Sequence, residues 1–309
     1  MEKKNLSQEA APILSDEELT SQLAKYKALL VLGKLLVGAG VVVTGISLFT
    51  GMIPGVVVGI LLAIIGSLVS QKASGAIKTR TSSNLVRAAL ESVFDNVDYQ
   101  PFRHLSSSQI YSAGMAFPFS FDEIEGSDCV KAVYKGLNIE MSDISLVSVT
   151  TTEDENGMQS ESRSTVFQGL WMICDFGKTL SAEVKLSKRS KLDRLFRSKG
   201  IQTESEEFNK RFCIQSESPV EAFYILTPHM MEYILGMQSK GGGDVYMSFL
   251  REGRVHIAIN SGRDSFEAEK GTVNAAALRE KFVGEIRYIT DLIDELRLVD
   301  TLYQKEGTV

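Results

Sequence analysis

The side chains that most often do chemistry in proteins are sparse in this chain and follow no familiar spacing. The histidines are His104, His229 and His256, and the cysteines are Cys129, Cys174 and Cys213. None of them forms an H-E-x-x-H, H-x-H, C-x-x-C or Cys-His arrangement, which are the spacings typical of metal and redox sites. The sequence therefore predicts no metal site and no cofactor. Three distant thiols also argue against a disulfide framework and suit a reducing compartment.

Two short segments copy fragments of phosphate-binding motifs. Gly177-Lys178-Thr179 ends like a Walker A loop, but Met172 stands at the position of its first glycine, and no helix is predicted to follow. The triplet at 175–177 matches a kinase triplet without the other kinase motifs. We therefore expect no nucleotide site and no catalytic residues recognisable by motif.

One charged segment stands out, because residues 185–199 contain seven basic side chains and the single acid Asp193. An amphipathic basic segment on a tethered domain can lie on anionic lipid headgroups. The residues predicted to make such contacts are Lys188, Arg189, Lys191, Arg194 and Arg197. The competing interpretation is a solvated connector, since a charge run usually faces water.

The elements that position these residues begin with an apolar block. The chain has 309 residues and a net charge of −6, so nucleic acid is not an expected partner. Residues 28–70 contain one charged side chain, Lys34. Two spans, 28–49 and 53–70, are long enough to cross a bilayer core of about 30 Å, and glycine and proline at 50–55 predict a tight turn between them.

The flanks of this block predict its orientation. Lys25 and Lys27 precede the first span, Lys72 and Lys78 follow the second, and the turn carries no charge. By the positive-inside rule, both termini are cytoplasmic, and the protein is expected in a bacterial inner membrane with two spans. A cleaved signal peptide is the competing interpretation, but a second span follows at once. Lys34 is expected to snorkel toward the interface.

Small residues recur at every fourth position near and within the second span. They are Gly51, Gly55, Gly59, Ala63 and Ser67. Such a line predicts a smooth face against which another helix packs closely. We expect packing against the first span of the same chain, with self-association as the other interpretation.

The remaining pattern predicts an α+β protein, in which the transmembrane hairpin precedes a domain with an antiparallel sheet and a long C-terminal helix. The expected division is a cytoplasmic segment with a short helix at 1–27, the hairpin at 28–70, a connecting helix and linker at 71–109, the cytoplasmic domain at 110–299, and a tail at 300–309. A helix is predicted to continue from the hairpin to residue 97.

Within the domain, periodicity predicts an ordered series of elements. Strands are expected at 130–134, 137–141 and 144–150, followed by an acidic loop at 151–163 and a strand pair at 164–174 and 181–186. Three helices are expected next, beginning at Thr203, Ser218 and Thr227. A hairpin at 245–250 and 254–260 and a helix at 274–298 complete the series.

An ordered set of short segments resembles a bacterial family of membrane-anchored proteins catalogued only as a domain of unknown function. The segments are 112–117, 126–130, 167–171 with the turn at 175–178, 207–212 and 224–228. The resemblance covers about 110–298 together with the anchor. It implies a bacterial source and a single domain, and it implies no activity. Large apolar members of the set, such as Trp171, are expected in the core.

Three functions remain open at this level. The first is a membrane-tethered interaction or scaffold module that binds other membrane or cytoplasmic proteins. The second is a module that senses anionic lipid or the envelope through 185–199. The third is an enzyme with a dispersed site, for which Asp128, Glu207 and His229 would be candidates by type alone.

Overall fold

The computed structural model describes residues 16–81, 85–153, 159–175, 179–189, 200–241, 243–266 and 274–302. The chain divides into two compact units, one formed by residues 1–92 and 266–284 and the other by residues 93–265 and 285–309. We describe each unit by itself.

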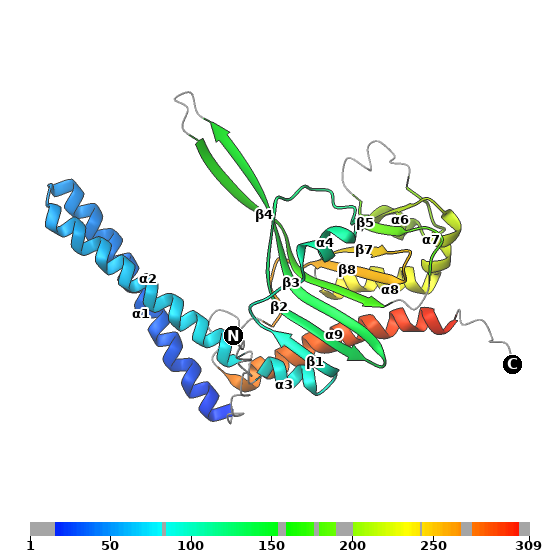
Figure 1. Cartoon of the computed structure of the whole chain (residues 1–309), viewed down its shortest axis with the longest axis horizontal. Helices are drawn as coiled ribbons and strands as arrows, with labels where there is room; N and C mark the ends of the chain where they lie inside the picture. Colours follow the sequence, from blue (N-terminus) through cyan, green and yellow to red (C-terminus); the bar gives the residue numbers. More distant parts are fainter. Residues whose placement is uncertain are drawn as a thin grey trace, which may run out of the picture. The chain divides into compact units, whose positions relative to one another are not determined.

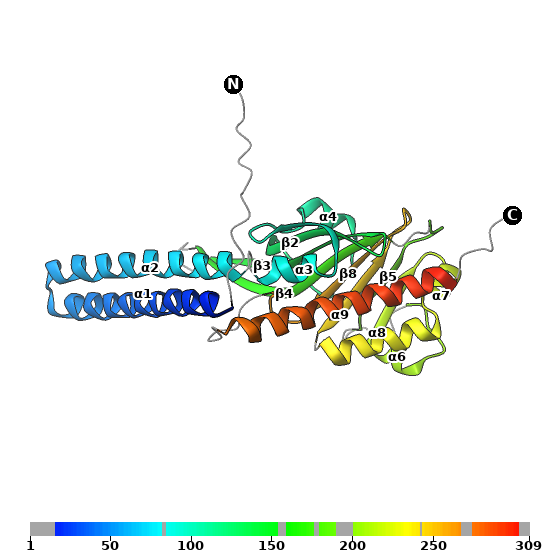
Figure 2. The same ribbon diagram turned by 90° about the horizontal axis from the view of Figure 1, so that it is seen from below.

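The first unit is dominated by an antiparallel pair of helices, α1 (Asp16–Thr50) and α2 (Ile53–Thr81). They lie side by side in Figures 1 and 2. Gly51 makes the tight turn between them with a φ of 71°, a conformation that favours glycine because it has no Cβ. The two helices have 35 and 29 residues, so both extend beyond the predicted spans at 28–49 and 53–70.

The two helices pack through small residues that recur every seventh position. These are Gly33, Gly40 and Ser47 on α1, and Gly59, Gly66 and Ala73 on α2, and all six are buried. A Cβ added to Gly59 would lie 2.7 Å from the Gly40 carbonyl oxygen, so only glycine allows this approach. A seven-residue repeat is the spacing that keeps one seam facing its partner along a pair of packed helices.

This seam differs in part from the predicted line of small residues. Gly55, Gly59 and Ala63 do face α1, where their neighbours are Ser47, Thr44 and Gly40. Gly51 lies in the turn with nothing within 4 Å of an added Cβ, and it therefore belongs to no packing face. The four-residue spacing drifts around the helix, whereas the seven-residue spacing stays on the seam.

The rest of the first unit gathers at the other end of the pair. It comprises α3 (Arg87–Glu91) and the first ten residues of α9 (Ala275–Leu302). The backbone N–H of Ala275 donates to Thr20 Oγ1 at 3.2 Å, which ties the start of α9 to α1. Leu19, Leu23, Leu278 and Phe282 are buried.

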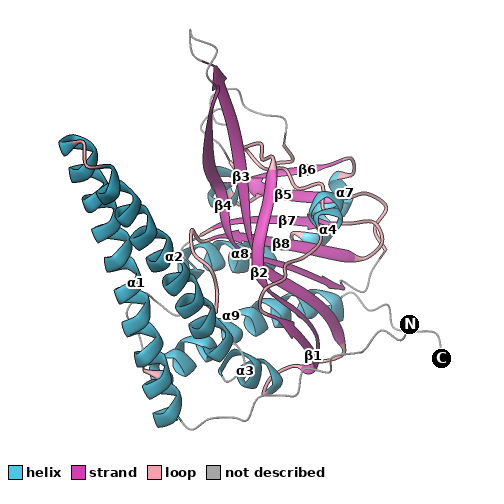
Figure 3. Cartoon of the chain, turned by 60° about the vertical axis from the view of Figure 1, so that its left-hand side comes forward, coloured by secondary structure: helices cyan, strands magenta, loops and turns pink. Residues whose placement is uncertain are grey.

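The second unit is built on one antiparallel sheet. Within the described ranges it has eight strands in the order β1-β2-β3-β4-β8-β7-β5-β6, as Figure 3 shows. The strands are β1 (Asp95–Gln100), β2 (Glu123–Tyr134), β3 (Leu137–Glu153), β4 (Gln159–Asp175), β5 (Val184–Lys188), β6 (Phe212–Ser216), β7 (Asp244–Phe249) and β8 (Arg254–Asn260). The predicted antiparallel sheet and C-terminal helix are therefore confirmed.

Both faces of the sheet are covered near its centre. On one face, Trp171 and Tyr246 pack with residues of α4 (Ser107–Ser112) and of the aromatic loop after it, including Phe117. On the other face lie α8 (Pro228–Gly241) and the part of α9 from Glu285 onward (Figure 2). The shorter helices α6 (Glu206–Arg211) and α7 (Pro219–Ile225) flank β6. Because both faces are buried, the central strands have nearly continuous apolar sequences.

Several local sequence signals are confirmed. Lys135 and Gly136 form the turn between β2 and β3 with positive φ angles. Ser218 caps α7 by accepting a hydrogen bond from the Glu221 N–H at 3.3 Å. Trp171 is fully buried, and a Cβ on Gly169, whose φ is 153°, would collide with the Ile259 carbonyl. The glycine therefore permits the close approach of β8.

Other expectations near the start of the sheet were wrong. The connecting helix does not reach residue 97, because α3 ends at Glu91 and residues 95–100 form β1, whose Tyr99 is buried beside β2. Residues 137–153 form one strand rather than two. The predicted acidic loop at 151–163 is narrower, since both of its flanks pair as β3 and β4, and residues 154–158 lie outside the described residues.

Expectations in the second half were also wrong in two places. The segments at 164–174 and 181–186 do not pair with each other, because β8 pairs with β4 and β7 pairs with β5. The cap of α6 is Ser205, two residues after Thr203, and it accepts from the Phe208 N–H at 3.3 Å. The helix stops at Arg211, since Phe212 begins β6 against β5.

Candidate functional site

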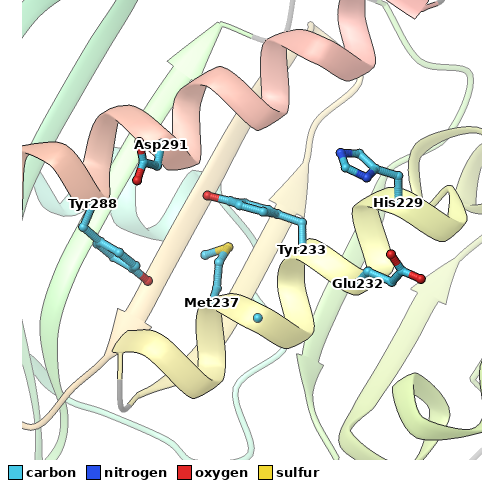
Figure 4. Close-up of a pocket in the computed structure, with 7 residues that line it drawn as sticks. His229, Glu232, Tyr233, Met237, Tyr288 and Asp291 are labelled. Atoms are coloured by element: carbon cyan, nitrogen blue, oxygen red, sulfur yellow. The ribbon is translucent and has the colours of Figure 1, made fainter.

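A pocket of about 270 Å³ opens between α8 and α9 in the second unit. Its lining residues are His229, Glu232, Tyr233, Gly236, Met237, Tyr288 and Asp291. Figure 4 shows Tyr233 reaching from α8 toward α9, with its hydroxyl on the side where Tyr288 and Asp291 stand. His229 and Glu232 lie at the other side of the pocket, on the first turns of α8.

The local sequence explains why these side chains meet. Thr227 caps α8 by accepting from the Met230 N–H at 3.3 Å, and Pro228 suits the first turn because it lacks an N–H. Met230, Ile234 and Met237 are buried at helical spacing, which fixes the rotation of α8.

On α9, Ile286, Ile289 and Ile293 are buried in the same way. Fixing the two apolar stripes turns Tyr233 and Gly236 of α8 toward Tyr288 and Asp291 of α9. The missing side chain of Gly236 leaves part of the space that the pocket occupies, because a Cβ there would meet nothing within 4 Å.

The polar groups of the pocket are unevenly satisfied. The Tyr288 hydroxyl is buried and has no hydrogen-bond partner among the described residues. Burial raises the pKa of this phenol to about 12, so it remains protonated at neutral pH. The carboxylates of Glu232 and Asp291 are exposed at the rim, and no lysine or arginine is among the lining residues. The pocket therefore presents negative charge, two phenol rings and one buried hydroxyl.

The three candidates chosen by residue type do not share these surroundings. His229 lines the pocket. Asp128 is buried in β2, where it accepts from the Tyr99 hydroxyl at 2.5 Å. Glu207 lies on α6 and forms an ion pair with Arg211 at 2.8 Å. Only one of the three thus belongs to the pocket.

Two of the five residues predicted to contact lipid, Lys188 and Arg189, lie within the described residues. Lys188 is ion-paired with Asp244 at 2.8 Å. Arg189 is buried and donates from Nε to the Phe212 carbonyl at 3.2 Å, so its side chain makes a contact inside the domain. Lys191, Arg194 and Arg197 lie outside the described residues.

Two buried titratable groups lie in the sheet, away from the pocket. The His256 side chain is fully buried, and Trp171 Nε1 donates to its Nδ1 at 3.4 Å. Burial lowers the pKa of His256 to about 4, so the ring is neutral at pH 7. Burial also raises the pKa of Asp143 well above its ordinary value, against the opposing hydrogen bond from the Ser265 N–H at 2.9 Å.

The cysteines are likewise part of the core. Cys129, Cys174 and Cys213 are buried, and none of the three is in a disulfide bond. Burial raises the pKa of Cys174 to about 12, which keeps this thiol protonated and unreactive.

The sequence pattern alone did not indicate the pocket. Glu232, Tyr233, Tyr288 and Asp291 belong to no motif. Tyr288 and Asp291 are three residues apart and share one face of α9. Glu232 and Tyr233 are adjacent, so their side chains point about 100° apart around α8. That one face meets the other depends on the packing of α8 and α9, which no local signal specifies.

Comparison with known proteins bears on the region that contains this pocket. Residues 165–298 match the model of a family described as "Protein of unknown function (DUF3137)". The chain therefore carries a domain of unknown function. All seven lining residues fall within the matched region. No match was found among curated proteins or among solved structures.

Proposed function

We propose that this chain is a membrane-anchored interaction module, in which the helical hairpin crosses a bacterial inner membrane and holds the domain in the cytoplasm. The proposal depends chiefly on the outer surface of the hairpin. Both helices are long and apolar enough to cross a membrane, and only 11% of each apolar window is buried. A core helix of a soluble protein would be mostly buried, so the pair does not fit that class.

The exposed side chains describe this surface in detail. Phe49, Ile53 and Leu68 are 94%, 76% and 53% exposed, and many other large aliphatic residues on α1 and α2 are at least half exposed. Apolar area in water costs roughly 25 cal/mol per Å², and patches of this extent are rare on soluble monomers. Hydrocarbon removes the cost, since the backbone of both helices is satisfied internally.

The orientation follows from the charges that flank the spans. Lys25 and Lys27 lie before the first span, and Lys72 and Lys78 after the second. Basic flanks are retained in the cytoplasm, so the turn at Gly51 faces outward and both termini face inward. A reducing cytoplasm also suits three free thiols.

The experiment combines membrane extraction with cysteine labelling. The wild-type chain should stay in the membrane pellet after an alkaline wash. In intact cells, an impermeant maleimide should label Met52→Cys, which is exposed beside the turn, and should label Glu206→Cys on α6 only after lysis. The native cysteines are buried and give a low background. Release by the wash, or the reverse labelling pattern, would contradict the proposal.

The interaction role is favoured over the other two hypotheses by the surroundings of their residues. Arg189 is buried, so the lipid-contact hypothesis loses one of its five residues. Asp128 is buried in a hydrogen bond with Tyr99, and Glu207 forms an exposed ion pair on α6. Neither lines the pocket, so two of the three residues of the enzyme hypothesis lie outside it. Crosslinking through the cytoplasmic domain in intact cells should retain specific protein partners, and a domain that captures none would count against the interaction role.

A further inference from the structure

We propose that the pocket between α8 and α9 binds a small organic cation that carries N–H groups, with a linear primary diamine as its best-fitting form. This inference does not depend on the membrane proposal, because it concerns the second unit alone.

The charge of the pocket selects for a cation. Glu232 and Asp291 contribute carboxylates from the two helices, and no lysine or arginine is among the lining residues. No described residue forms an ion pair with either carboxylate. A ligand with a positive group toward each helix would neutralise both, whereas an anion would be repelled by both.

The walls of the pocket suit a cation on an alkyl chain. Tyr233 and Tyr288 supply phenol rings, whose faces attract ammonium groups. Met237, which is buried at the base, supplies an apolar and polarisable surface for methylene groups. Rings, thioether and carboxylates together match an amine better than they match a hydrated metal ion, which takes an oxygen-rich shell.

The hydroxyl of Tyr288 distinguishes between kinds of cation. Its oxygen is buried and has no partner among the described residues, which leaves a polar group unsatisfied at an energetic cost. A primary ammonium group donates N–H bonds and would satisfy that oxygen. A quaternary ammonium group has no N–H and would leave it unsatisfied.

The size of the pocket limits the ligand to a few heavy atoms. Its volume of about 270 Å³ lies below the usual range for drug-sized ligands. Small ligands of this kind bind with dissociation constants on the order of micromolar to millimolar.

The test is isothermal titration calorimetry on the full chain in detergent with 1,4-diaminobutane as the probe. Butylamine should bind more weakly, because it has one charge. Tetramethylammonium should bind more weakly still, and 1,4-butanediol should not bind. Asp291→Asn and Glu232→Gln should each weaken diamine binding about tenfold, which is the usual effect of losing one charged contact.

Two further variants make the result specific. Tyr288→Phe removes only the hydroxyl and should weaken diamine binding several-fold while leaving tetramethylammonium binding unchanged. Glu206→Gln on α6 removes an exposed carboxylate outside the pocket and should bind like the wild type. Urea unfolding curves followed by Trp171 fluorescence would show that each variant is folded.

Several outcomes would overturn the inference. They are the absence of heat with the diamine at millimolar concentration, equal binding of tetramethylammonium and diamine, and equal loss in Glu206→Gln and Asp291→Asn. Binding of a lysine-containing peptide without binding of any free amine would also overturn it, since the pocket would then recognise a protein partner.

Discussion

The neutral His256 in the core makes the stability of the second unit sensitive to acid. The ring is fully buried, and its Nδ1 accepts a hydrogen bond from Trp171 Nε1. Nε2 has no partner among the described residues. Protonation would turn Nδ1 into a donor that faces the indole N–H, and it would also place an unpaired charge in the core.

The magnitude follows from the pKa of the ring. The pKa of His256 falls from 6.5 to about 4 on folding because burial disfavours the charged form. The unfolded chain therefore binds the proton more tightly, and stability is lost as the pH falls through 6.5 toward 4. Linkage gives a loss of about 1.4 kcal/mol at pH 5.5 and about 3 kcal/mol at pH 4, relative to pH 8. Such a loss is a large share of a typical domain stability of about 5–15 kcal/mol.

The assay is urea unfolding of the full chain in detergent at pH 7.5, 5.5 and 4, followed by the fluorescence of Trp171, the one tryptophan in the sequence. At about 2–3 kcal/mol per molar urea, the expected loss at pH 4 lowers the midpoint by about 1 M or more. Other groups also titrate, so the informative quantity is the difference between the wild type and His256→Gln. The variant should lack this part of the pH dependence.

The control is His229→Gln, which removes an exposed histidine on α8 and should retain the part of the pH dependence that comes from His256. Parallel pH profiles for wild type and His256→Gln would refute the reasoning. An imidazole resonance of His256 that titrates near 6.5 in the folded protein would refute it directly, since the ring would then be accessible to protons.

Three further predictions concern packing and charge. Gly59→Leu should push the two helices apart, because its Cβ would press on the backbone of α1. Gly45→Leu should be tolerated, because no atom lies within 4 Å of a Cβ added at that position. The efficiency of cysteine crosslinking between α1 and α2 measures the effect of each variant. Gly169→Ala should lower the free energy of unfolding by at least about 1–3 kcal/mol in urea, since it combines a positive φ with a collision against β8. Gly284→Ala on α9 should raise the free energy of unfolding slightly. Equal effects of the two variants would contradict the packing. The wild type should lose stability as the pH rises above about 3.8, because the Asp143 carboxyl holds its proton more tightly in the folded chain than in the unfolded one. Asp143→Asn should lack this loss. Identical pH profiles of the two proteins would contradict the raised pKa of Asp143.

The helical pair was predictable because its signal is local. A long apolar run with glycine and proline at its centre specifies two helices and a turn whatever surrounds them. The seven-residue seam was also present in the sequence, but the four-residue spacing of Gly51, Gly55 and Gly59 obscured it. Only the paired helices show which small residues face each other, because the packing of the two helices decides which spacing stays on the contact.

In the sheet, too, pairings between strands close in the chain were predictable, and pairings between distant strands were not. The β2–β3 and β7–β8 hairpins were predictable, since Lys135-Gly136 and Glu252-Gly253 mark their turns. The pairing of β4 with β8 joins strands far apart in the chain, and no turn residue encodes it. Likewise, β1 and β6 are short strands that gain their order from a neighbour rather than from their own periodicity.

The sequence by itself determined the apolar helical pair, the α+β class, the cap of α7 and the absence of familiar catalytic motifs, because each depends on residues close together in the chain. The tertiary structure alone decided the strand order, the burial of His256 and Asp143, the internal use of Arg189, and the meeting of Tyr233 with Tyr288 and Asp291. These depend on which faces of distant elements are pressed together, and the free energy of that packing is a property of the whole fold.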